Sequence, residues 1–441
     1  MSDLKEQAKS IFLDTVRRID VERLIHSRVR VENETLKLDD LELRLSNFRR
    51  IVLIGFGKAS LKMGSALEQL LGDRLSAGVL VTDRRHSVVV RSEVIVAGHP
   101  LPDANSIKAG AKIIETVRGC GSDCLLIFLI SGGASAMVEL PIASDIVLDD
   151  LRDLNQTLIR SGANIHEINT IRKYLSRIKG GKLGRLARKS TVVALYLSDV
   201  NPGDVCALAS NPLSPESVTR QDVMEIIKRY DLGGRLRASV SRALNSQSEL
   251  RGERETDEAD NLRGLLLLDN FAAIDAAAAA ARSAGFRTWI DYSRQEGHYR
   301  DVAEALIEQT LSMKARFPRE RVCVVSGGEV SCPVDGDGVG GRNQEFVLYS
   351  AARLSKVVSG SDIAVLSCGT DGIDGNSFAA GAVVDQDTWR DASRNGVDAG
   401  GFLRRNDSHS FFRRFGGLVV SGPTGNNVRD IRIGLGQSRR T

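Results

Sequence analysis

The sequence predicts an α/β fold with a largely parallel sheet, and two observations carry that prediction. Short β-branched apolar runs recur along the chain, and each is followed by a loop rich in Gly or Asp and then by a segment of helical period. The 42 glycines cluster in those loops, which is where open α/β sheets bring their backbone close to a ligand. At 441 residues, the chain is long enough for two or three domains.

The elements of the first half follow in chain order. An amphipathic helix is predicted over residues 4–25, and the apolar run 50–56 predicts a strand that leads into a helix over 58–71. Further strands are predicted over residues 77–83, 124–131 and 191–199. Residues 241–260 are strongly polar and lack an apolar period, so we expect an exposed connection near a domain boundary.

The second half repeats this architecture without repeating the sequence. The run LLLLDN precedes an Ala-rich helix predicted over residues 272–284, and another helix is predicted near 302–317. Two strand-loop units, VCVVSGGEV and IAVLSCGTDGIDG, come after these helices.

Charge and hydropathy exclude several classes of protein. The 60 Lys and Arg are nearly balanced by 56 Asp and Glu, for a net charge of +4, and they are scattered along the chain. That distribution does not favour nucleic-acid binding. No apolar stretch approaches the 18 residues that a membrane-spanning helix needs, and the polar start MSDLKEQAKS resembles no secretory signal. We therefore expect a cytoplasmic protein with neither a nucleic-acid nor a membrane partner.

Two glycine-rich loops are candidate anion sites. Gly57 and Lys58 lie in GFGKAS, directly after a strand and before a helix, where backbone N–H groups favour phosphate. The loop is not a Walker A motif, and the alternative is a solvated Lys beside a packing turn. In SGGASA, Ser131, Gly132, Gly133 and Ser135 offer bare backbone and hydroxyl groups to an anion. This loop lacks the GxSxG pattern of a hydrolase nucleophile.

Acidic residues follow two of the predicted strands. Asp199 and Asp204 lie in LSDVNPGD, and Asp371 lies in GTDGIDG. Carboxylates at strand ends are suited to binding Mg²⁺ or to acting as a base toward a substrate hydroxyl. The alternative is that these residues form helix caps and Asx-turns, which use the same residue types in the same places.

Two further loops carry polar side chains suited to a substrate. Arg342, Asn343 and Glu345 follow a glycine pair in GGRNQE, and the guanidinium can clamp a carboxylate or a phosphate through two hydrogen bonds. The alternative there is an exposed charge cluster at a helix start. His99, in GHPLPD, precedes a proline and is held in an extended conformation; it is either a substrate contact or a structural loop residue.

Taken in order, these motifs resemble the glycerate 2-kinase family with a MOFRL C-terminal domain, some of whose members have been named hydroxypyruvate reductases. The resemblance is carried by GFGKAS, GHPLPDANS, LISGGASA, the segment 169–181, LSDVNPGD, SGGE, GGRNQE, GTDGIDG and SGPTGNNVRD. It implies two three-layer α/β/α domains: a Rossmann-like domain over residues 1–245 and a second over 246–441 that contains the MOFRL region (about 320–432).

The resemblance also implies ATP-dependent phosphorylation of D-glycerate at its 2-hydroxyl, with Mg²⁺, and ties Lys58 and Arg342 most closely to activity. We expect these two cations to face the transferring phosphoryl group and the glycerate carboxylate. Asp199 is expected to hold Mg²⁺ or to orient the 2-hydroxyl of glycerate, and Asp204 and Asp371 are the alternatives for this role. Oligomeric state is left open, with a homodimer as one alternative.

The sequence departs from the family pattern at Asn211, where a Gly is usual. If that position needs a positive φ, Asn is the mildest replacement. Two other functions stay open. A nicotinamide-dependent hydroxypyruvate reductase is suggested by GFGKAS together with Asp83, Arg84 and Arg85, although Lys58 inside the loop argues against it. A catalytically silent protein that binds sugar acids is the third alternative.

Overall fold

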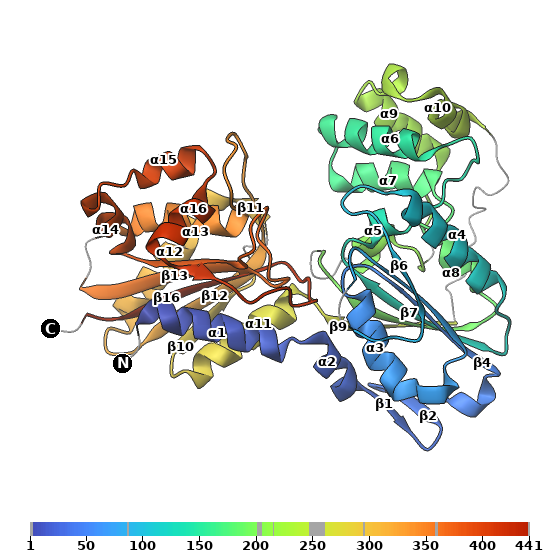
Figure 1. Cartoon of the computed structure of the whole chain (residues 1–441), viewed down its shortest axis with the longest axis horizontal. Coiled ribbons are helices and arrows are strands. Elements are labelled where there is room, and N and C mark those ends of the chain that lie inside the picture. The colour runs from blue at the N-terminus through green and yellow to red at the C-terminus, as the bar shows by residue number, and fades with distance from the viewer. Residues whose placement is uncertain are drawn as a thin grey trace. The chain divides into compact units, whose positions relative to one another are not determined.

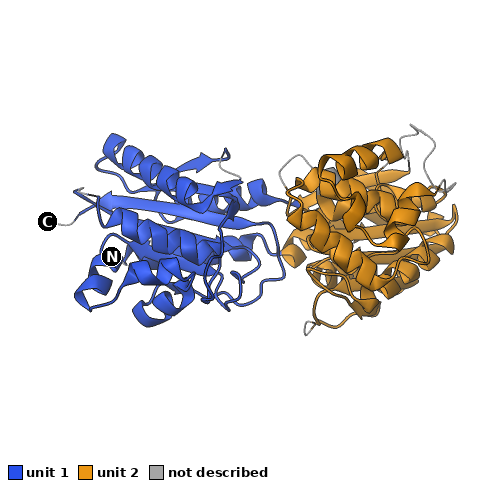
Figure 2. Ribbon diagram, turned by 90° about the horizontal axis from the view of Figure 1, so that it is seen from above, with its two compact units in different colours: residues 1–20, 268–441 blue, residues 21–267 orange. Residues whose placement is uncertain are grey.

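The computed structural model describes residues 3–85, 88–200, 205–214, 216–246, 261–293, 296–357 and 360–439. The chain divides into two compact units, which Figure 2 colours separately: unit 1 is residues 1–20 and 268–441, and unit 2 is residues 21–267. The predicted domains, 1–245 and 246–441, differ from these units at the N-terminus and near residue 267. Of the predicted polar connection, residues 247–260 lie outside the described residues, whereas residues 241–245 belong to a helix and correct that expectation.

Unit 2 is built on a six-stranded sheet of order β6-β5-β4-β7-β8-β9 (Figure 1). The pairs β6–β5, β5–β4, β4–β7 and β7–β8 are parallel, which confirms the prediction for this half of the chain. Every residue of β7 is buried, as is typical of a central strand covered on both faces. The strands are β4 (Arg50–Phe56), β5 (Ala77–Thr82), β6 (Glu93–Val96), β7 (Cys124–Ser131), β8 (Thr191–Leu197) and β9 (Leu262–Leu268).

Helices cover both faces of this sheet. One face of β4 packs on Ile113 of α4 and Leu183 of α8 in a single apolar core, and α3 contacts β4, β5 and β7. Helix α4 starts where Asp103 accepts the backbone N–H of Ser106 in a capping box. The layer helices are α2 (Val21–Arg28), α3 (Ser60–Leu71), α4 (Ala104–Arg118), α5 (Ala134–Met137) and α8 (Lys182–Leu186).

A group of four further helices has its own apolar core, in which Leu151, Leu154 and Leu158 of α6 pack at helical spacing. These helices are α6 (Leu148–Arg160), α7 (Ile165–Leu175), α9 (Arg220–Arg229) and α10 (Ala238–Asn245). Unit 2 also contains an antiparallel meander that the sequence analysis missed: β1 (Val29–Glu32), β2 (Thr35–Leu38) and β3 (Leu41–Arg44).

Unit 1 holds a seven-stranded sheet of order β10-β12-β16-β13-β14-β15, with β11 beside β12. The C-terminal strand β16 inserts between β12 and β13 and runs antiparallel to both, and β13 and β14 are also antiparallel. The expectation of a largely parallel sheet is therefore wrong for this unit. The strands are β10 (Arg287–Asp291), β11 (Glu296–His298), β12 (Val322–Ser331), β13 (Ser361–Gly369), β14 (Gly381–Asp385), β15 (Leu418–Val419) and β16 (Asp430–Ser438).

Helices again cover both faces, so each unit has three layers, α/β/α, as predicted (Figure 1). Helices α1 and α11 lie together on one face, and α12 and α13 on the other. The helices of unit 1 are α1 (Leu4–Arg18), α11 (Asn270–Ser283), α12 (Tyr299–Arg316), α13 (Arg342–Leu354), α14 (Thr388–Arg394), α15 (Ala399–Arg404) and α16 (Ser408–Phe415).

The single opening helix predicted over residues 4–25 is two helices, because its two halves bury their apolar faces in different cores. In α1, Leu4, Ala8, Ile11 and Phe12 are buried, and the helix packs on α11 and β13. In α2, Val21 and Ile25 are buried, and the helix packs on α3.

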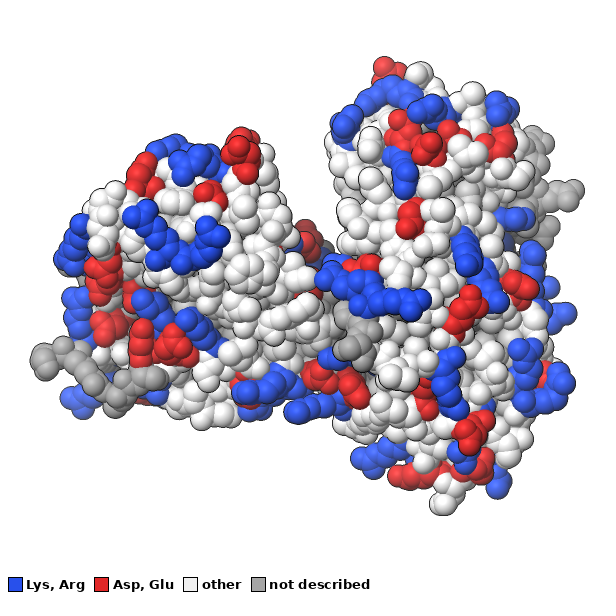
Figure 3. All heavy atoms as spheres, in the orientation of Figure 1, with Lys and Arg blue, Asp and Glu red and all other residues white. Residues whose placement is uncertain are grey.

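The surface agrees with the scattered charge of the sequence. Figure 3 shows basic and acidic side chains interspersed over the visible face of each unit. None of the helices in the described ranges combines the length and apolar character needed to cross a membrane.

Candidate functional site

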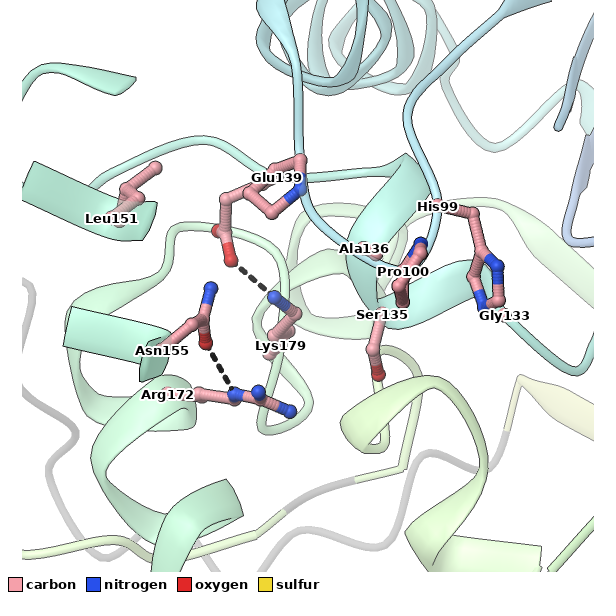
Figure 4. A pocket seen from close by; sticks show the side chains of 11 residues that line it. His99, Pro100, Gly133, Ser135, Ala136, Glu139, Leu151, Asn155, Arg172 and Lys179 are labelled. Carbon is pink, nitrogen blue, oxygen red and sulfur yellow. Dashed lines mark hydrogen bonds and ion pairs between the residues drawn. The ribbon is translucent and has the colours of Figure 1, made fainter. Parts of the chain in front are cut away.

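Unit 2 contains a polar cavity of about 180 Å³, bounded by loops that follow β6 and β7 and by helices α6 and α7 (Figure 4). The lining residues are His99, Pro100, Pro102, Gly133, Ser135, Ala136, Glu139, Leu151, Asn155, Arg172 and Lys179. Both loops lie at the carboxyl ends of parallel strands, where open α/β sheets place their ligands. Three residues predicted from the sequence, His99, Gly133 and Ser135, are therefore brought together here.

The two glycine loops are joined by hydrogen bonds. The Lys58 N–H donates to the Gly132 carbonyl at 3.0 Å, and the Ala59 N–H donates to Ser131 Oγ at 3.0 Å. Gly57 has φ 120°, and a Cβ there would lie 2.3 Å from Ser131 Oγ, so only glycine allows this approach. The Gly57 N–H donates to the Val81 carbonyl, and Ser131 Oγ already accepts the Ala59 N–H, so the geometry does not favour direct phosphate contacts from Gly57 and Ser131.

Lys58 and His99 lie near each other at the rim of the cavity. Partial burial and the charge of Lys58 lower the pKa of His99, which is therefore neutral at pH 7. The His99 ring lies against Gly133, where an added Cβ would approach its Cδ2 to 3.0 Å. Lys58 is half-buried. The ammonium group of Lys58 thus belongs to the same region as the cavity.

Ser135 presents its hydroxyl as a hydrogen-bond acceptor. Ser210 Oγ donates to Asn169 Oδ1 at 3.2 Å, and Ser135 Oγ lies 2.9 Å from Ser210 Oγ. Since the Ser210 proton is directed to Asn169, Ser135 donates its own proton to Ser210. Its remaining lone pair is suited to a hydroxyl group of a ligand.

Glu139 and Lys179 form a buried ion pair beside the cavity. Glu139 also accepts hydrogen bonds from Ser176 Oγ and from the Leu140 N–H at 2.9 Å. The carboxylate is thus fully engaged by donors of the protein itself. A buried ion pair with this many hydrogen bonds compensates its own charges, so it fixes the cavity wall without adding net charge.

Arg172 has no such partner. Its Nε donates to the amide oxygen of Asn155 at 2.8 Å, and no carboxylate among the described residues lies within ion-pair distance of its guanidinium. Figure 4 shows the guanidinium extending toward the side of the cavity that carries Ser135. Burial lowers its pKa, although an arginine stays charged at pH 7. The neighbouring lysines differ: Lys173 pairs with Glu216, and Lys182 donates to three backbone carbonyls.

The cavity therefore carries one uncompensated positive charge, because Glu139 neutralises Lys179 and His99 is neutral. A single anionic group placed against Arg172 balances that charge and completes its hydrogen bonding. Both the volume and the charge match a small monoanionic acid.

In unit 1, Arg342 is the first residue of α13, behind Gly341. Its Nε and Nη2 donate to the two oxygens of the buried Asp430 carboxylate at 2.7 and 2.9 Å, and its Nη1 lies 2.9 Å from Glu329. Asp430 and Glu329 raise the pKa of Arg342 against the effect of burial. The predicted clamp thus has a fixed geometry, but carboxylates of the protein already occupy it.

Asp374 caps the start of α13. Its carboxylate accepts the backbone N–H groups of Asn343 and Gln344 at 3.0 and 2.9 Å, and both of their side-chain amides. Burial raises the pKa of Asp374 to about 6, against the effect of these four donors. Asn343 also donates to Asp430 at 3.0 Å. Asn343 therefore acts within the protein, in the helix-cap arrangement that was the alternative to a substrate contact.

The predicted metal ligands belong to different parts of the chain. Asp199 is half-buried after β8, Asp204 lies outside the described residues, and Asp371 is in unit 1, where it accepts the Ile373 N–H in an Asx-turn. Across the part of the chain that the structure describes, no three His, Cys, Asp or Glu side chains are placed to hold a metal ion together.

The sequence analysis assigned no role to Glu139, Asn155, Arg172 and Lys179. Arg172 and Lys179 lie in the segment 169–181, whose basic residues alternate with apolar ones as on any amphipathic helix. What sets Arg172 apart is the lack of a carboxylate partner, which depends on how α6 packs on α7 and leaves no trace in the local sequence. Asn211 has a φ of 50°, so the position does adopt the left-handed conformation that Asn tolerates better than most residues.

Comparisons with known proteins cover almost the whole chain. Residues 7–245 match the family model described as a domain of unknown function (DUF4147), and residues 322–430 match the MOFRL family. The D-glycerate 2-kinase of Thermotoga maritima is 35% identical over 88% of this chain and 91% of its own. A protein of Agrobacterium vitis with a provisional hydroxypyruvate reductase name is 39% identical over 87% and 98%. The crystal structure of a Thermotoga maritima glycerate kinase superposes with a TM-score of 0.83 at 31% identity, covering 98% and 99%.

Proposed function

The chain belongs to the glycerate kinase family, and we propose that it transfers the terminal phosphoryl group of ATP to the 2-hydroxyl of D-glycerate. One observation from the site carries the choice of acceptor. The unit 2 cavity is small, and its uncompensated charge is the single guanidinium of Arg172. A three-carbon monocarboxylate meets both conditions, whereas a nucleoside triphosphate is too large and too highly charged for it.

We assign the carboxylate of glycerate to Arg172 and one of its hydroxyls to Ser135. The guanidinium offers two parallel N–H groups to a carboxylate, and Ser135 accepts a proton-bearing hydroxyl because its own proton is directed to Ser210. His99 and Gly133 close the cavity on the side of Lys58. In this arrangement the protein holds the acceptor in place, which is the main part of catalysis of phosphoryl transfer.

The sequence analysis assigned Lys58 and Arg342 to charge on the transferring phosphoryl group and on the glycerate carboxylate. With the carboxylate now assigned to Arg172, we propose that both offset charge on the phosphoryl group. Mg²⁺ supplies further charge neutralisation on the nucleotide phosphates. It typically keeps several waters and uses one or two protein carboxylates, so the protein needs no dedicated cluster of three ligands. Asp199 fits such a role by its place after β8, with Asp204 and Asp371 as the alternatives.

The reductase alternative loses its main support in the first glycine loop. A dinucleotide fold uses the backbone N–H groups of that loop to bind pyrophosphate. Here those of Gly57, Lys58, Ala59 and Ser60 donate to Val81, Gly132, Ser131 and Gly57 of the protein itself. These four backbone donors are therefore already used.

Phosphorus NMR of a mixture of the protein, D-glycerate, ATP and Mg²⁺ tests the proposal. Hydroxypyruvate with NADH or NADPH is run in parallel. We expect a 2-phosphoglycerate signal and no nicotinamide oxidation. A 3-phosphoglycerate signal keeps the kinase but overturns the placement of the acceptor hydroxyl. Nicotinamide oxidation without ADP formation overturns the kinase itself.

A further inference from the structure

Unit 1 holds a second, larger cavity, of about 410 Å³, which takes no part in the proposed binding of glycerate. It lies between the end of β12, the loop 333–341 and the start of α13. Its volume falls in the range of ordinary ligand sites. The lining residues are Glu329, Val330, Cys332, Val334, Gly338, Gly340, Gly341, Arg342, Glu345, Gly375, Asn376 and Asn406.

Hydrogen bonds from other segments fix the loop that bounds this cavity. Asn406 Oδ1 accepts the N–H groups of Asp335 and Gly336, each at 2.9 Å. Asn376 Oδ1 accepts the N–H of Gly340 at 2.8 Å, and Asp407 Oδ1 accepts that of Val339 at 3.1 Å. Because its backbone donors are held in this way, the cavity is formed before any ligand binds.

Glu345 is the unsatisfied group in this cavity. Its side chain lines the space although the residue is only 2% exposed, and neither carboxyl oxygen has a hydrogen-bond partner in the described structure. The hydroxyl and the backbone N–H of Ser408 face the carboxyl group and oppose the effect of burial on its pKa, but neither forms a hydrogen bond to it of ordinary geometry, and the hydroxyl also lacks a partner among the described residues. Burial raises the pKa of Glu345 to about 7. A buried carboxyl group without donors costs stability, which a ligand that supplies a donor recovers.

The charges around the cavity favour a neutral ligand group. Arg342 is fully paired with Asp430 and Glu329, so the cavity offers no surplus positive charge to a phosphate. Val330 and Val334 add apolar surface to the walls. A flat, largely apolar group that carries hydrogen-bond donors matches this combination.

Resting on the proposed kinase activity, we propose that this cavity binds the nucleoside part of ATP and that Glu345 accepts a hydrogen bond from it. Two donors of a nucleoside have the required chemistry: a ribose hydroxyl and the exocyclic amine of adenine. The volume of about 410 Å³ accommodates a nucleoside, in contrast to the 180 Å³ of the unit 2 cavity.

Calorimetric titration with ADP, without turnover, tests this site in the wild type and in Glu345→Gln. The variant keeps the size of the side chain and one acceptor oxygen but removes the negative charge of the carboxylate. We expect ADP affinity to fall about tenfold at a pH where the wild-type carboxyl group is ionised, because a hydrogen bond to a charged group is stronger than one to a neutral amide. Unchanged ADP affinity in the variant overturns the proposal.

Analogues identify the donor. If a ribose hydroxyl binds Glu345, the wild type discriminates against 2′-deoxy- or 3′-deoxy-ADP, and Glu345→Gln loses that discrimination. If the adenine amine binds Glu345, the wild type instead discriminates against inosine diphosphate, and Glu345→Gln loses that discrimination. If each protein binds ADP and all three analogues with the same affinity, neither discriminates between them, and the direct contact is overturned.

A second variant keeps the test independent of Glu345. Val334 is 74% exposed at the cavity, so Val334→Trp narrows the opening without disturbing a core. We expect it to weaken ADP at least tenfold and to leave D-glycerate binding unchanged. Unchanged ADP binding overturns the location. Failure of the kinase itself appears separately, as an absent product signal in the NMR assay while ADP still binds.

Discussion

Two arginines, one in each unit, are embedded in opposite ways. Arg342 is held by two carboxylates, one of them the fully buried Asp430. Its charge is therefore balanced and its geometry fixed without a ligand. Arg172 donates to a neutral amide and has no carboxylate partner in the described residues. The first arrangement contributes to the stability of the fold, whereas the second leaves a binding capacity unused.

The two arginines differ in how strongly their surroundings indicate a ligand. A bidentate Arg–Asp pair such as that of Arg342 and Asp430 is common in structural networks and does not by itself indicate a ligand. A partly buried guanidinium without a counter-ion is costly to keep, so Arg172 points more directly to an anionic substrate. Replacing each arginine in turn separates its contribution to stability from its contribution to binding.

Replacing Arg342 is expected to have the largest effect. In Arg342→Met the Asp430 carboxylate stays buried without its partner, which costs about 3–5 kcal/mol of unfolding free energy. If Arg342 also offsets charge on the phosphoryl group, kcat falls by about 10³-fold or more. Urea denaturation and steady-state kinetics measure the two effects.

Arg342→Lys is the matched control, because it keeps the charge but cannot form the two parallel hydrogen bonds to Asp430. It should be more stable than Arg342→Met and still lose at least about 10²-fold in kcat. Near-normal kcat in a folded Arg342→Lys would remove Arg342 from the reaction and leave it a structural residue.

Arg172→Met should show the reverse pattern. We expect the KM for D-glycerate to rise about 100-fold, the effect of losing a charged hydrogen-bonded pair with the carboxylate. The unfolding free energy should stay within about 1 kcal/mol of the wild type, since no buried acid loses its partner. Arg177→Met removes the same charge from an exposed side chain and should leave KM unchanged. A KM that rises equally in both variants contradicts a specific role for Arg172.

Glu345 is expected to make the stability of the folded protein depend on pH. Its pKa is raised to about 7 in the folded state, so between about pH 4.5 and pH 7 the unfolded chain loses a proton that the folded chain keeps. Stability therefore falls as pH rises through this window, by about 1 kcal/mol per pH unit. In Glu345→Gln this contribution is absent, so the variant gains stability over the wild type as pH rises.

Denaturation of both proteins at several pH values, without nucleotide, measures this difference. Asp374 also has a raised pKa and interacts with Glu345, so Asp374→Asn is introduced into both proteins to isolate the contribution of Glu345. A stability difference that is constant from pH 5 to pH 7 contradicts the unsatisfied, protonated state of Glu345.

The same contrast shows what the sequence alone predicts. Strand-loop alternation predicted the α/β class and the parallel sheet around β7, because both depend on local periodicity, and the family resemblance implied the two three-layer units. It did not predict that β16 inserts antiparallel into the second sheet, since that pairing joins residues such as Val322 and Gly436 that are far apart in the chain. Arg342 was found through its glycine-rich context. Arg172 was not, because its significance is that no carboxylate among the described residues pairs with it, which only the tertiary structure shows.

The substitution Asn211→Gly is expected to have the smallest effect, and it tests which wall of the unit 2 cavity recognises the substrate. Asn211 has a φ of 50°, and its backbone carbonyl accepts the Gly181 N–H at 2.7 Å, next to the Ser210 that contacts Ser135. Asn211→Gly relieves the left-handed strain but loses the hydrogen bonds of the side chain to Glu216 and to the Ser214 N–H. These effects nearly cancel, so the unfolding free energy should change by less than about 1 kcal/mol.

If Arg172 and Asn155 on α7 and α6 carry recognition of the carboxylate, the KM of Asn211→Gly for D-glycerate stays within about twofold of the wild type. Ser135 is the residue of the cavity lining whose side chain is hydrogen-bonded to the turn at 209–211 in the described structure. Asn155→Leu, which removes the one hydrogen-bond partner of Arg172 but keeps the size of the side chain, is the matched variant and should raise KM more. A larger rise in Asn211→Gly than in Asn155→Leu would move recognition from the helical wall to the turn, and Arg172 would then be a contact to the phosphoryl group rather than to the acid.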